Sequence, residues 1–272
     1  MRRCKRIRYK LVPKRLSTRY MGMAQVQGND IVTAAVLVIG DEILSGRTKD
    51  KNIGYIAEHC TKIGILVREV RIVPDDEDEI VAAVNALRSR YDYVFTTGGI
   101  GPTHDDITAD AIAKAFGVKI DVDPRALALL LPYYEKRGME VTPARLRMAR
   151  IPEGAELIEN SISVAPGFML GNVITLAGIP NVMQVMLDAV TPRLRTGKKM
   201  HSVAIDLQVP EGTVADIFAE HQKAYPTISM GSYPVFRDNK PSTQLVLRST
   251  DPDLLAEAVD GLKAKLSAKG ML

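Results

Sequence analysis

The chain has 272 residues, 46% of them hydrophobic and 25% charged, which is enough to bury the core of one large domain with or without a small second one. Its two cysteines exclude a disulfide scaffold and a four-cysteine zinc site, and they are typical of a reducing cytosol. The formal charge is +4, but nine Lys and Arg residues stand in the first twenty positions, so the remainder carries −5. A mildly acidic remainder does not favour nucleic acid as a partner.

Residues 1–30 form a basic extension that we expect to be disordered. A basic arm, a transit peptide and an incorrectly chosen start site all fit this composition. No apolar segment of the kind found in a secretory signal follows the basic residues.

Strands and helices are predicted to alternate through the first half of the chain. Apolar runs predict strands at 33–40, 65–73 and 91–97, and helical periodicity predicts helices at 50–63, 75–90 and 107–116. This order implies a parallel sheet, in which ligands bind at the carboxyl ends of the strands. The loops at 40–46, 74–76 and 98–106 should therefore converge on one edge of the sheet.

In the second half of the chain, strands and helices are not predicted to alternate regularly. We expect a helix from Pro124 that Pro132 kinks or ends, a short helix from Pro143, paired strands within 156–175 and a helix at 180–195. The uncharged stretch at 160–187 is broken repeatedly by Pro and Gly, so it does not predict a membrane span. Beyond a linker at 197–200, residues 201–272 read as a small β-α-β-β-α domain.

The segment TTGGIGPTHDDIT at 96–108 combines groups that bind anions. Gly98, Gly99 and Gly101 allow unusual dihedral angles and let backbone N–H groups approach a ligand. The helix that follows adds positive charge at its start, so the segment predicts a phosphate or carboxylate site. Thr96, Thr97 and Thr103 are candidate hydroxyl donors.

Pairs of acids follow each of the three strands. They are Asp41 with Glu42, Asp75 with Asp76, and Asp105 with Asp106. Each pair has a structural explanation, because acids often cap helices. Beside a phosphate site they also suggest a divalent metal, since Mg²⁺ is held by one or two carboxylates together with substrate phosphates. His104 is a candidate acid or base, and His59 reads as a surface residue.

Several motifs resemble the MoaB/Mog (molybdopterin-binding) domain family, and most closely its competence/damage-inducible CinA type. They are GDEILSG at 40–46, TTGGIGPTHDDIT at 96–108, IPEGA at 151–155, APGF at 165–168 and LAGIP at 176–180. The resemblance implies an α/β fold with a three-layer parallel-sheet core at 31–196, followed by a small α+β domain at 201–272. The amidase domain of long CinA proteins is not expected in this sequence.

The resemblance also implies which residues act. It implies catalytic acids at Asp75 and Asp106 and metal ligands at Asp105 and Asp106. Substrate-binding residues implied by the motifs and the glycine loop are Gly40, Asp41, Ser45, Thr97, Gly98, Gly99, Gly101, Pro166, Gly167, Gly178 and Pro180. Two segments depart from the family pattern. Ser163-Val164 replaces Gly-Thr or Gly-Ser, and in LAGIPNV at 176–182 Ala177 replaces a proline and Val182 replaces a glutamate.

By this resemblance the protein is expected to be a cytoplasmic hydrolase, a pyrophosphatase that uses Mg²⁺, Mn²⁺ or Co²⁺ to cleave a nucleotide such as ADP-ribose or FAD. Two alternatives remain open: a non-catalytic module with molybdopterin as its ligand, and a molybdopterin adenylyltransferase. The expected partner is a small phosphorylated ligand, and the expected assembly is a homo-oligomer. Neither nucleic acid nor a membrane is expected as a partner.

Overall fold

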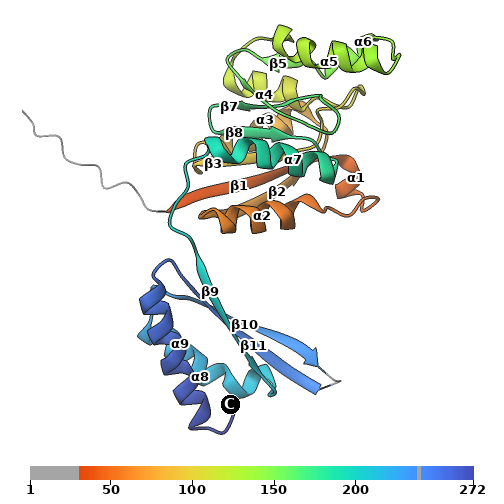
Figure 1. Cartoon of the computed structure of the whole chain (residues 1–272). Coiled ribbons are helices and arrows are strands. Elements are labelled where there is room, and N and C mark those ends of the chain that lie inside the picture. Colours follow the sequence, from red (N-terminus) through yellow and green to blue (C-terminus); the bar gives the residue numbers. More distant parts are fainter. Residues whose placement is uncertain (1–30, 238–239) are drawn as a thin grey trace, which may run out of the picture.

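The computed structural model describes residues 31–237 and 240–272, so the predicted extension at 1–30 lies outside the described residues. Two regions follow one another along the chain, a larger α/β region and a smaller region that begins at β9 (His201–Leu207) (Figure 1). In the described part of the chain, no helix is both long enough and apolar enough to cross a membrane.

The larger region is built on a six-stranded sheet with helices on both faces. In sheet order its strands are β2 (Ile65–Val73), β1 (Val32–Ile39), β3 (Tyr93–Thr97), β8 (Val173–Leu176), β7 (Gly167–Leu170) and β6 (Glu156–Ile158). The first four run parallel to one another, as predicted for β2, β1 and β3. β7 runs antiparallel to both of its neighbours, β8 and β6, and makes the sheet mixed. The carboxyl ends of β1, β2 and β3 meet at one edge, where the candidate site lies.

Helices cover both faces of this sheet. They are α1 (Asp41–Leu44), α2 (Asn52–Lys62), α3 (Glu77–Arg88), α4 (Thr108–Phe116) and α7 (Pro180–Val190), with the 3-10 turn η1 (Thr191–Arg193) after α7. Alternate residues of β1 pack into two different cores. Val36 and its even-numbered neighbours contact α2 and α7, and Leu37 and its odd-numbered neighbours contact α3 and α4. A strand covered on both faces must be apolar throughout, which explains the continuous hydrophobic run at 33–40.

The segment at 120–152, between α4 and β6, leaves the main sheet and packs against α4; we call it the excursion. It contains β4 (Ile120–Val122), α5 (Pro124–Lys136), α6 (Pro143–Arg147) and β5 (Arg150–Pro152), and β4 pairs with β5 in an antiparallel ribbon. Of the two expectations for Pro132, a kink or the end of the helix, the second is wrong, because α5 continues to Lys136. The two three-residue strands were not predicted, since so short a run carries no periodicity.

The smaller region follows the predicted β-α-β-β-α order. Its remaining elements are α8 (Glu211–Ala224), β10 (Ser229–Arg237), β11 (Lys240–Ser249) and α9 (Pro252–Ser267), and the strands form an antiparallel sheet in the order β10-β11-β9. Leu245 and Leu247 of β11 lie in its core with Val214 of α8 and Leu262 of α9.

His221 of α8 is buried in this core. Its Nε2 lies 2.7 Å from the Ala258 carbonyl oxygen, and its Nδ1 lies 3.3 Å from Lys265 Nζ. Burial is the main cause that lowers the pKa of His221, and the Lys265 charge lowers it further, while the hydrogen bond to Ala258 opposes both.

We therefore expect the wild-type free energy of unfolding to fall as pH drops from about 8 to about 5. The unfolded chain takes up a proton on His221 near the ordinary imidazole pKa of about 6.5, whereas the folded chain does so only at lower pH. Urea titrations of His221→Gln should show a smaller fall, and the exposed His201→Gln is the matched control. Equal pH slopes for wild type and His221→Gln would contradict this assignment.

Candidate functional site

The glycine loop begins with a close approach between three strand ends. Gly98 follows β3 with φ +102°, and a Cβ atom there would lie 2.2 Å from the Ile39 carbonyl oxygen. Its N–H donates to the Leu176 carbonyl oxygen at 3.3 Å. Gly98 is therefore a packing residue that brings the ends of β1, β3 and β8 together, and its N–H is already engaged.

The next three residues present free backbone donors. Within the described residues, the N–H groups of Gly99, Ile100 and Gly101 donate no hydrogen bond. Gly99 adopts φ +66°, and its carbonyl oxygen accepts the Thr108 N–H at 3.0 Å. Because buried or partly buried N–H groups are normally paired, three adjacent free donors beside a cavity indicate an anionic ligand.

Asp106 closes this loop. Its Oδ2 accepts hydrogen bonds from the N–H and the hydroxyl of Thr103, at 2.8 and 2.5 Å. The expectation that Asp105 or Asp106 caps the following helix is wrong, because the N-cap position of α4 is Ile107 and has no side-chain cap. A Cβ atom on Gly101 would lie 2.6 Å from Asp106 Oδ2, so glycine at 101 makes room for this carboxylate.

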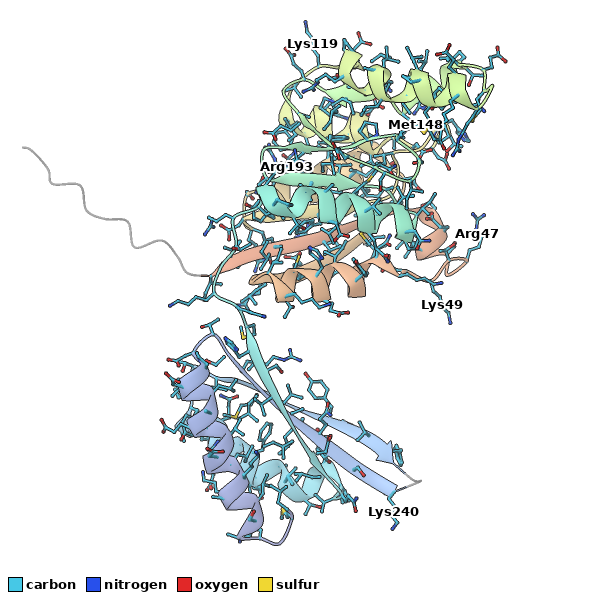
Figure 2. All side chains as sticks on the ribbon, viewed as in Figure 1. Arg47, Lys49, Lys119, Met148, Arg193 and Lys240 are labelled. Carbon is cyan, nitrogen blue, oxygen red and sulfur yellow. The ribbon has the colours of Figure 1, made fainter. Side chains whose placement is uncertain are left out.

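A cavity of about 620 Å³ opens over the loop. Its volume lies within the range of small-molecule sites. The residues that line it are Glu42, Thr48, Gly98, Gly99, Ile100, Gly101, Pro102, Asp106, Met148, Asn160, Ser163, Ala165, Ala177, Gly178, Ile179, Pro180, Val182 and Met186. The exposed Arg47 and Lys49 flank Thr48 in the loop after α1, where Figure 2 shows them projecting from the molecule.

Acids from the three predicted loops converge beside this cavity. Asp75 Oδ2 accepts the Asp41 N–H at 2.9 Å. Burial raises the pKa of Asp75, the hydrogen bond from Asp41 opposes that rise, and the charges of Glu42, Asp41 and Asp105 raise it again. Such crowding of carboxylates is relieved when a cation binds or when one carboxyl takes up a proton.

Asp76 caps a helix, which was the structural explanation offered for the pair Asp75 and Asp76. Its carboxylate accepts the N–H groups of Asp78 and Glu79 and so caps α3. Asp75 is therefore the member of this pair that faces the other acids.

The metal prediction rests on few ligands. No group of three or more His, Cys, Asp or Glu side chains in the described residues is placed to hold a metal ion. The charge of Asp105 contributes to raising the pKa of Asp75, and the role of Asp105 as a metal ligand stays a prediction. Asp106 is engaged with Thr103, so its role as a metal ligand stays a prediction.

The two candidate histidines differ in exposure. The side chain of His104 is 99% exposed and stands 4.0 Å from an Asp105 oxygen. The expectation that His59 is a surface residue is wrong: its side chain is 17% exposed and its Nε2 lies 2.7 Å from the Thr191 hydroxyl. His59 therefore joins α2 to the end of α7.

A tight loop before β7 shapes one wall of the cavity. The buried Asn160 donates from Nδ2 to the Ser163 hydroxyl (2.6 Å) and the Ala165 carbonyl (2.9 Å). Its Oδ1 accepts the N–H groups of Ile162 and Ser163. Val164 adopts φ +57°, an unfavourable conformation for a β-branched residue, and packs against the core. The departure from the family pattern thus leaves a hydroxyl at the cavity, on Ser163.

We expect Asn160→Ala to destabilise the protein by roughly 2–4 kcal/mol, because several hydrogen bonds are lost and two N–H groups are left unpaired. Urea unfolding measures this loss. Asn85→Ala on α3, where the amide contacts only the neighbouring Arg88, is the control and should change stability little. A loss below about 1 kcal/mol for Asn160→Ala would contradict the role of this side chain.

The wall beside α7 is apolar. Val182 is buried and lines the cavity with Ala177 and Met186, and Ile179 at the N-cap position of α7 is 67% exposed. Since valine stands where the family pattern has glutamate, this wall offers contact to a ring or an alkyl chain but no charge.

Some of the predicted substrate-binding residues line a cavity and the others do not. Gly98, Gly99, Gly101, Gly178 and Pro180 line the large cavity. Pro166 lines a second cavity of about 20 Å³ with Gly99 and Gly101. The others line neither cavity: Gly40, Asp41, Ser45, Thr97 and Gly167.

Three of the residues that line neither cavity, Thr97, Gly167 and Ser45, have positions with a physical explanation. Thr96 and Thr97 are buried within β3, so the structure does not place their hydroxyls where a ligand could bind them. A Cβ atom on Gly167 would lie 2.5 Å from the Thr175 carbonyl oxygen, which makes Gly167 a close-packing residue of the sheet. Ser45 is exposed at the end of α1.

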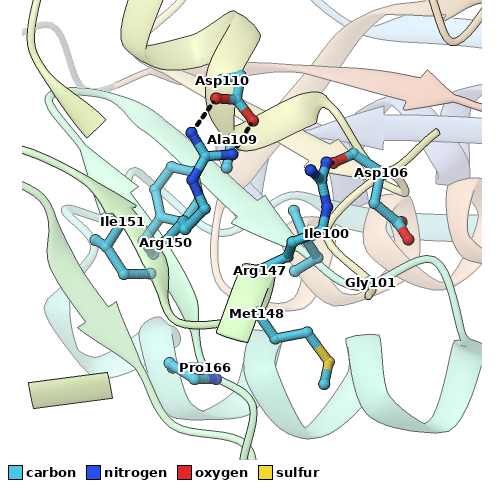
Figure 3. Close-up of a pocket in the computed structure, with 12 residues that line it drawn as sticks. Ile100, Gly101, Asp106, Ala109, Asp110, Arg147, Met148, Arg150, Ile151 and Pro166 are labelled. Carbon is cyan, nitrogen blue, oxygen red and sulfur yellow. Dashed lines mark hydrogen bonds and ion pairs between the residues drawn. The ribbon is translucent and has the colours of Figure 1, made fainter. Parts of the chain in front are cut away.

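Residues that the sequence did not indicate come from the excursion. Met148 lines both cavities, and Arg147 lines the smaller one (Figure 3). No local pattern marks either residue, because only the packing of α6 over the glycine loop brings them to the site.

The fold and site define the class of protein. Residues 35–196 match the family described as "probable molybdopterin binding domain", and residues 199–272 match "FAD synthase, middle domain". The chain belongs to this MoaB/Mog-type molybdopterin-binding domain family, as its motifs suggested.

Individual relatives show which members of this family the chain is similar to. A CinA-like protein of Desulfosudis oleivorans is 36% identical over 86% of this chain, which spans 60% of that relative's length. A protein of Pyrobaculum arsenaticum is 37% identical over 74% of this chain and 79% of its own. The crystal structure of CinA from Thermoplasma acidophilum, described as of unknown function, covers 60% of this chain and 98% of its own with 38% identity and a TM-score of 0.56.

Proposed function

We propose that the chain is a nucleotide pyrophosphatase that depends on a divalent metal and cleaves a substrate such as ADP-ribose or FAD. The observation that carries this proposal is the row of free N–H donors at Gly99, Ile100 and Gly101 beside the acids Asp75 and Asp105. The donors suit a diphosphate, and the acids suit a cation bound to it.

Each part of the site then has a task. The loop N–H groups hold phosphate oxygens. Asp105 would hold a divalent metal ion beside them, and that ion would supply charge neutralisation and a more acidic water. Water adds to one phosphorus, the bridging P–O bond breaks, and the two products of ADP-ribose are AMP and ribose 5-phosphate. Asp75, whose pKa is raised, accepts the proton of the attacking water.

The match of the second region supports this substrate class. The second region matches a middle domain of FAD synthase, an enzyme whose product contains the same AMP and diphosphate groups as the proposed substrates. The apolar wall at Ile179, Val182 and Met186 gives a flat base or ring a surface to lie on.

The test is to incubate the purified protein with ADP-ribose or FAD and Mg²⁺, Mn²⁺ or Co²⁺, and to follow AMP by chromatography. AMP release that stops on chelation and resumes with added metal is the expected result. Absence of AMP with every substrate and metal would refute the pyrophosphatase.

A non-catalytic molybdopterin-binding module is the second candidate. Val182 favours it, because this wall of the cavity lacks a carboxylate, and the family match names molybdopterin as the ligand. Pterin that copurifies with the protein, detected by fluorescence after oxidation, would support this candidate. It would be favoured if pterin is found and no AMP is released.

A further inference from the structure

Arg147, the last residue of α6, reaches across to the glycine loop. Its Nη2 donates to the carbonyl oxygen of Asp106 at 2.9 Å. Figure 3 shows its side chain beside Asp106 and Ile100. A cation from the excursion therefore stands beside the proposed phosphate site.

This guanidinium has unused donors. Arginine carries five N–H groups, and among the described residues only the Asp106 carbonyl accepts one from Arg147. Its Nε is buried without a hydrogen-bond partner. Leaving a charged donor buried and unpaired is costly, so an acceptor absent from the protein itself is indicated.

Arg147 also lacks a salt bridge. No carboxylate in the described part of the chain lies within 4.0 Å of its nitrogens, although the Arg147 charge still contributes to lowering the pKa of Asp105. Arg150, three residues later, differs in this respect: it forms a bidentate pair with Asp110 at 2.6 and 2.8 Å. The two arginines line the same small cavity, but of the two only Arg150 has its guanidinium paired with a carboxylate.

The loop and Arg147 border one small space. Gly99, Ile100, Gly101 and Arg147 all line the small cavity. Its volume of about 20 Å³ admits one water-sized group, such as a single oxygen of a phosphate that lies in the large cavity. Gly99, Ile100, Gly101 and Met148 also line that large cavity, so the two spaces adjoin.

We propose that Arg147 binds an oxygen of the ligand's phosphate together with the loop N–H groups, and that it sets the preference for phosphorylated over unphosphorylated ligands. The proposal rests on the phosphate site of the proposed function but does not require hydrolysis. Arginine suits this role because its planar fork matches phosphate geometry.

The test measures affinities for AMP, adenosine and inorganic pyrophosphate by calorimetry on the full chain. Arg147→Met should weaken AMP and pyrophosphate at least tenfold and leave adenosine within about twofold. Arg147→Lys should recover part of the loss, because the charge returns without the fork. Arg145→Met is the matched control: Arg145 lies on the same helix but contacts Tyr134 and the Glu140 carbonyl instead.

The outcomes separate the two proposals. If wild type prefers AMP to adenosine and Arg147→Met keeps that preference, the role of Arg147 is overturned and the phosphate site stands. If wild type shows no preference, both the phosphate site and the role of Arg147 fail. If the preference is lost only in Arg147→Met while wild type releases no AMP from ADP-ribose, Arg147 is confirmed and hydrolysis is not.

Discussion

Gly98→Ala is expected to destabilise the protein by at least about 3 kcal/mol, which is a large share of the stability of a typical domain. A Cβ atom at residue 98 would lie 2.2 Å from the Ile39 carbonyl oxygen, and the φ angle of +102° is unfavourable for alanine. Because the obstructing atom belongs to the backbone of β1, the clash is relieved only if the strand ends separate. Chemical unfolding and thermal melting measure the effect.

Gly54→Ala is the matched control for this substitution. Gly54 lies in α2, and a Cβ atom there would meet nothing within 4 Å. Alanine is the better helix former, so this variant should gain roughly 0.5–1 kcal/mol. If Gly98→Ala were as stable as wild type, the close approach of the three strand ends would be wrong, and so would the position of the glycine loop.

Asp75→Asn is expected to lower turnover of ADP-ribose by roughly 10²–10⁴-fold without lowering stability. Burial and the nearby Glu42, Asp41 and Asp105 raise the pKa of Asp75, so the ionised carboxylate is unfavourable in the folded protein. Asparagine removes that charge, and its amide oxygen can still accept the Asp41 N–H. Stability kept at the expense of activity is typical of catalytic groups.

Rates of AMP release and melting temperatures of the same preparations test this prediction. Asp76→Asn is the control, because asparagine is as good an N-cap as aspartate and should leave both α3 and turnover unchanged. Equal turnover in wild type and Asp75→Asn would exclude Asp75 as a catalytic acid. A drop in turnover that merely follows a drop in melting temperature would exclude it as well.

The core architecture could be predicted because its residues follow simple periodic rules. The uninterrupted apolar run of β1 indicated a strand covered on both faces, and β2 was predicted with its observed bounds, Ile65–Val73. The convergence of the acid-bearing loops followed from the geometry of parallel strands. Asp75 and Asp41 are hydrogen-bonded across two of these loops, as that geometry requires.

Other features of the site depend on contacts between distant residues. Thr97 and Gly167 belong to the expected motifs, but they pack inside the sheet. Arg147 and Met148 line the site from an excursion whose sequence carries no motif for it. Asp106 illustrates a further limit, because an acid before a helix can either cap that helix or close the preceding turn. Only the loop geometry decides between the two.

The proposed function depends on the N–H groups of Gly99, Ile100 and Gly101 binding a phosphate. Amide hydrogen exchange of these residues, measured by NMR with and without AMP and Mg²⁺, examines that binding at the atoms involved. The N–H groups have no acceptor in the free protein, so they should exchange rapidly and become protected when AMP binds. If AMP binds but protection appears only elsewhere in the protein, the glycine loop is not the phosphate site.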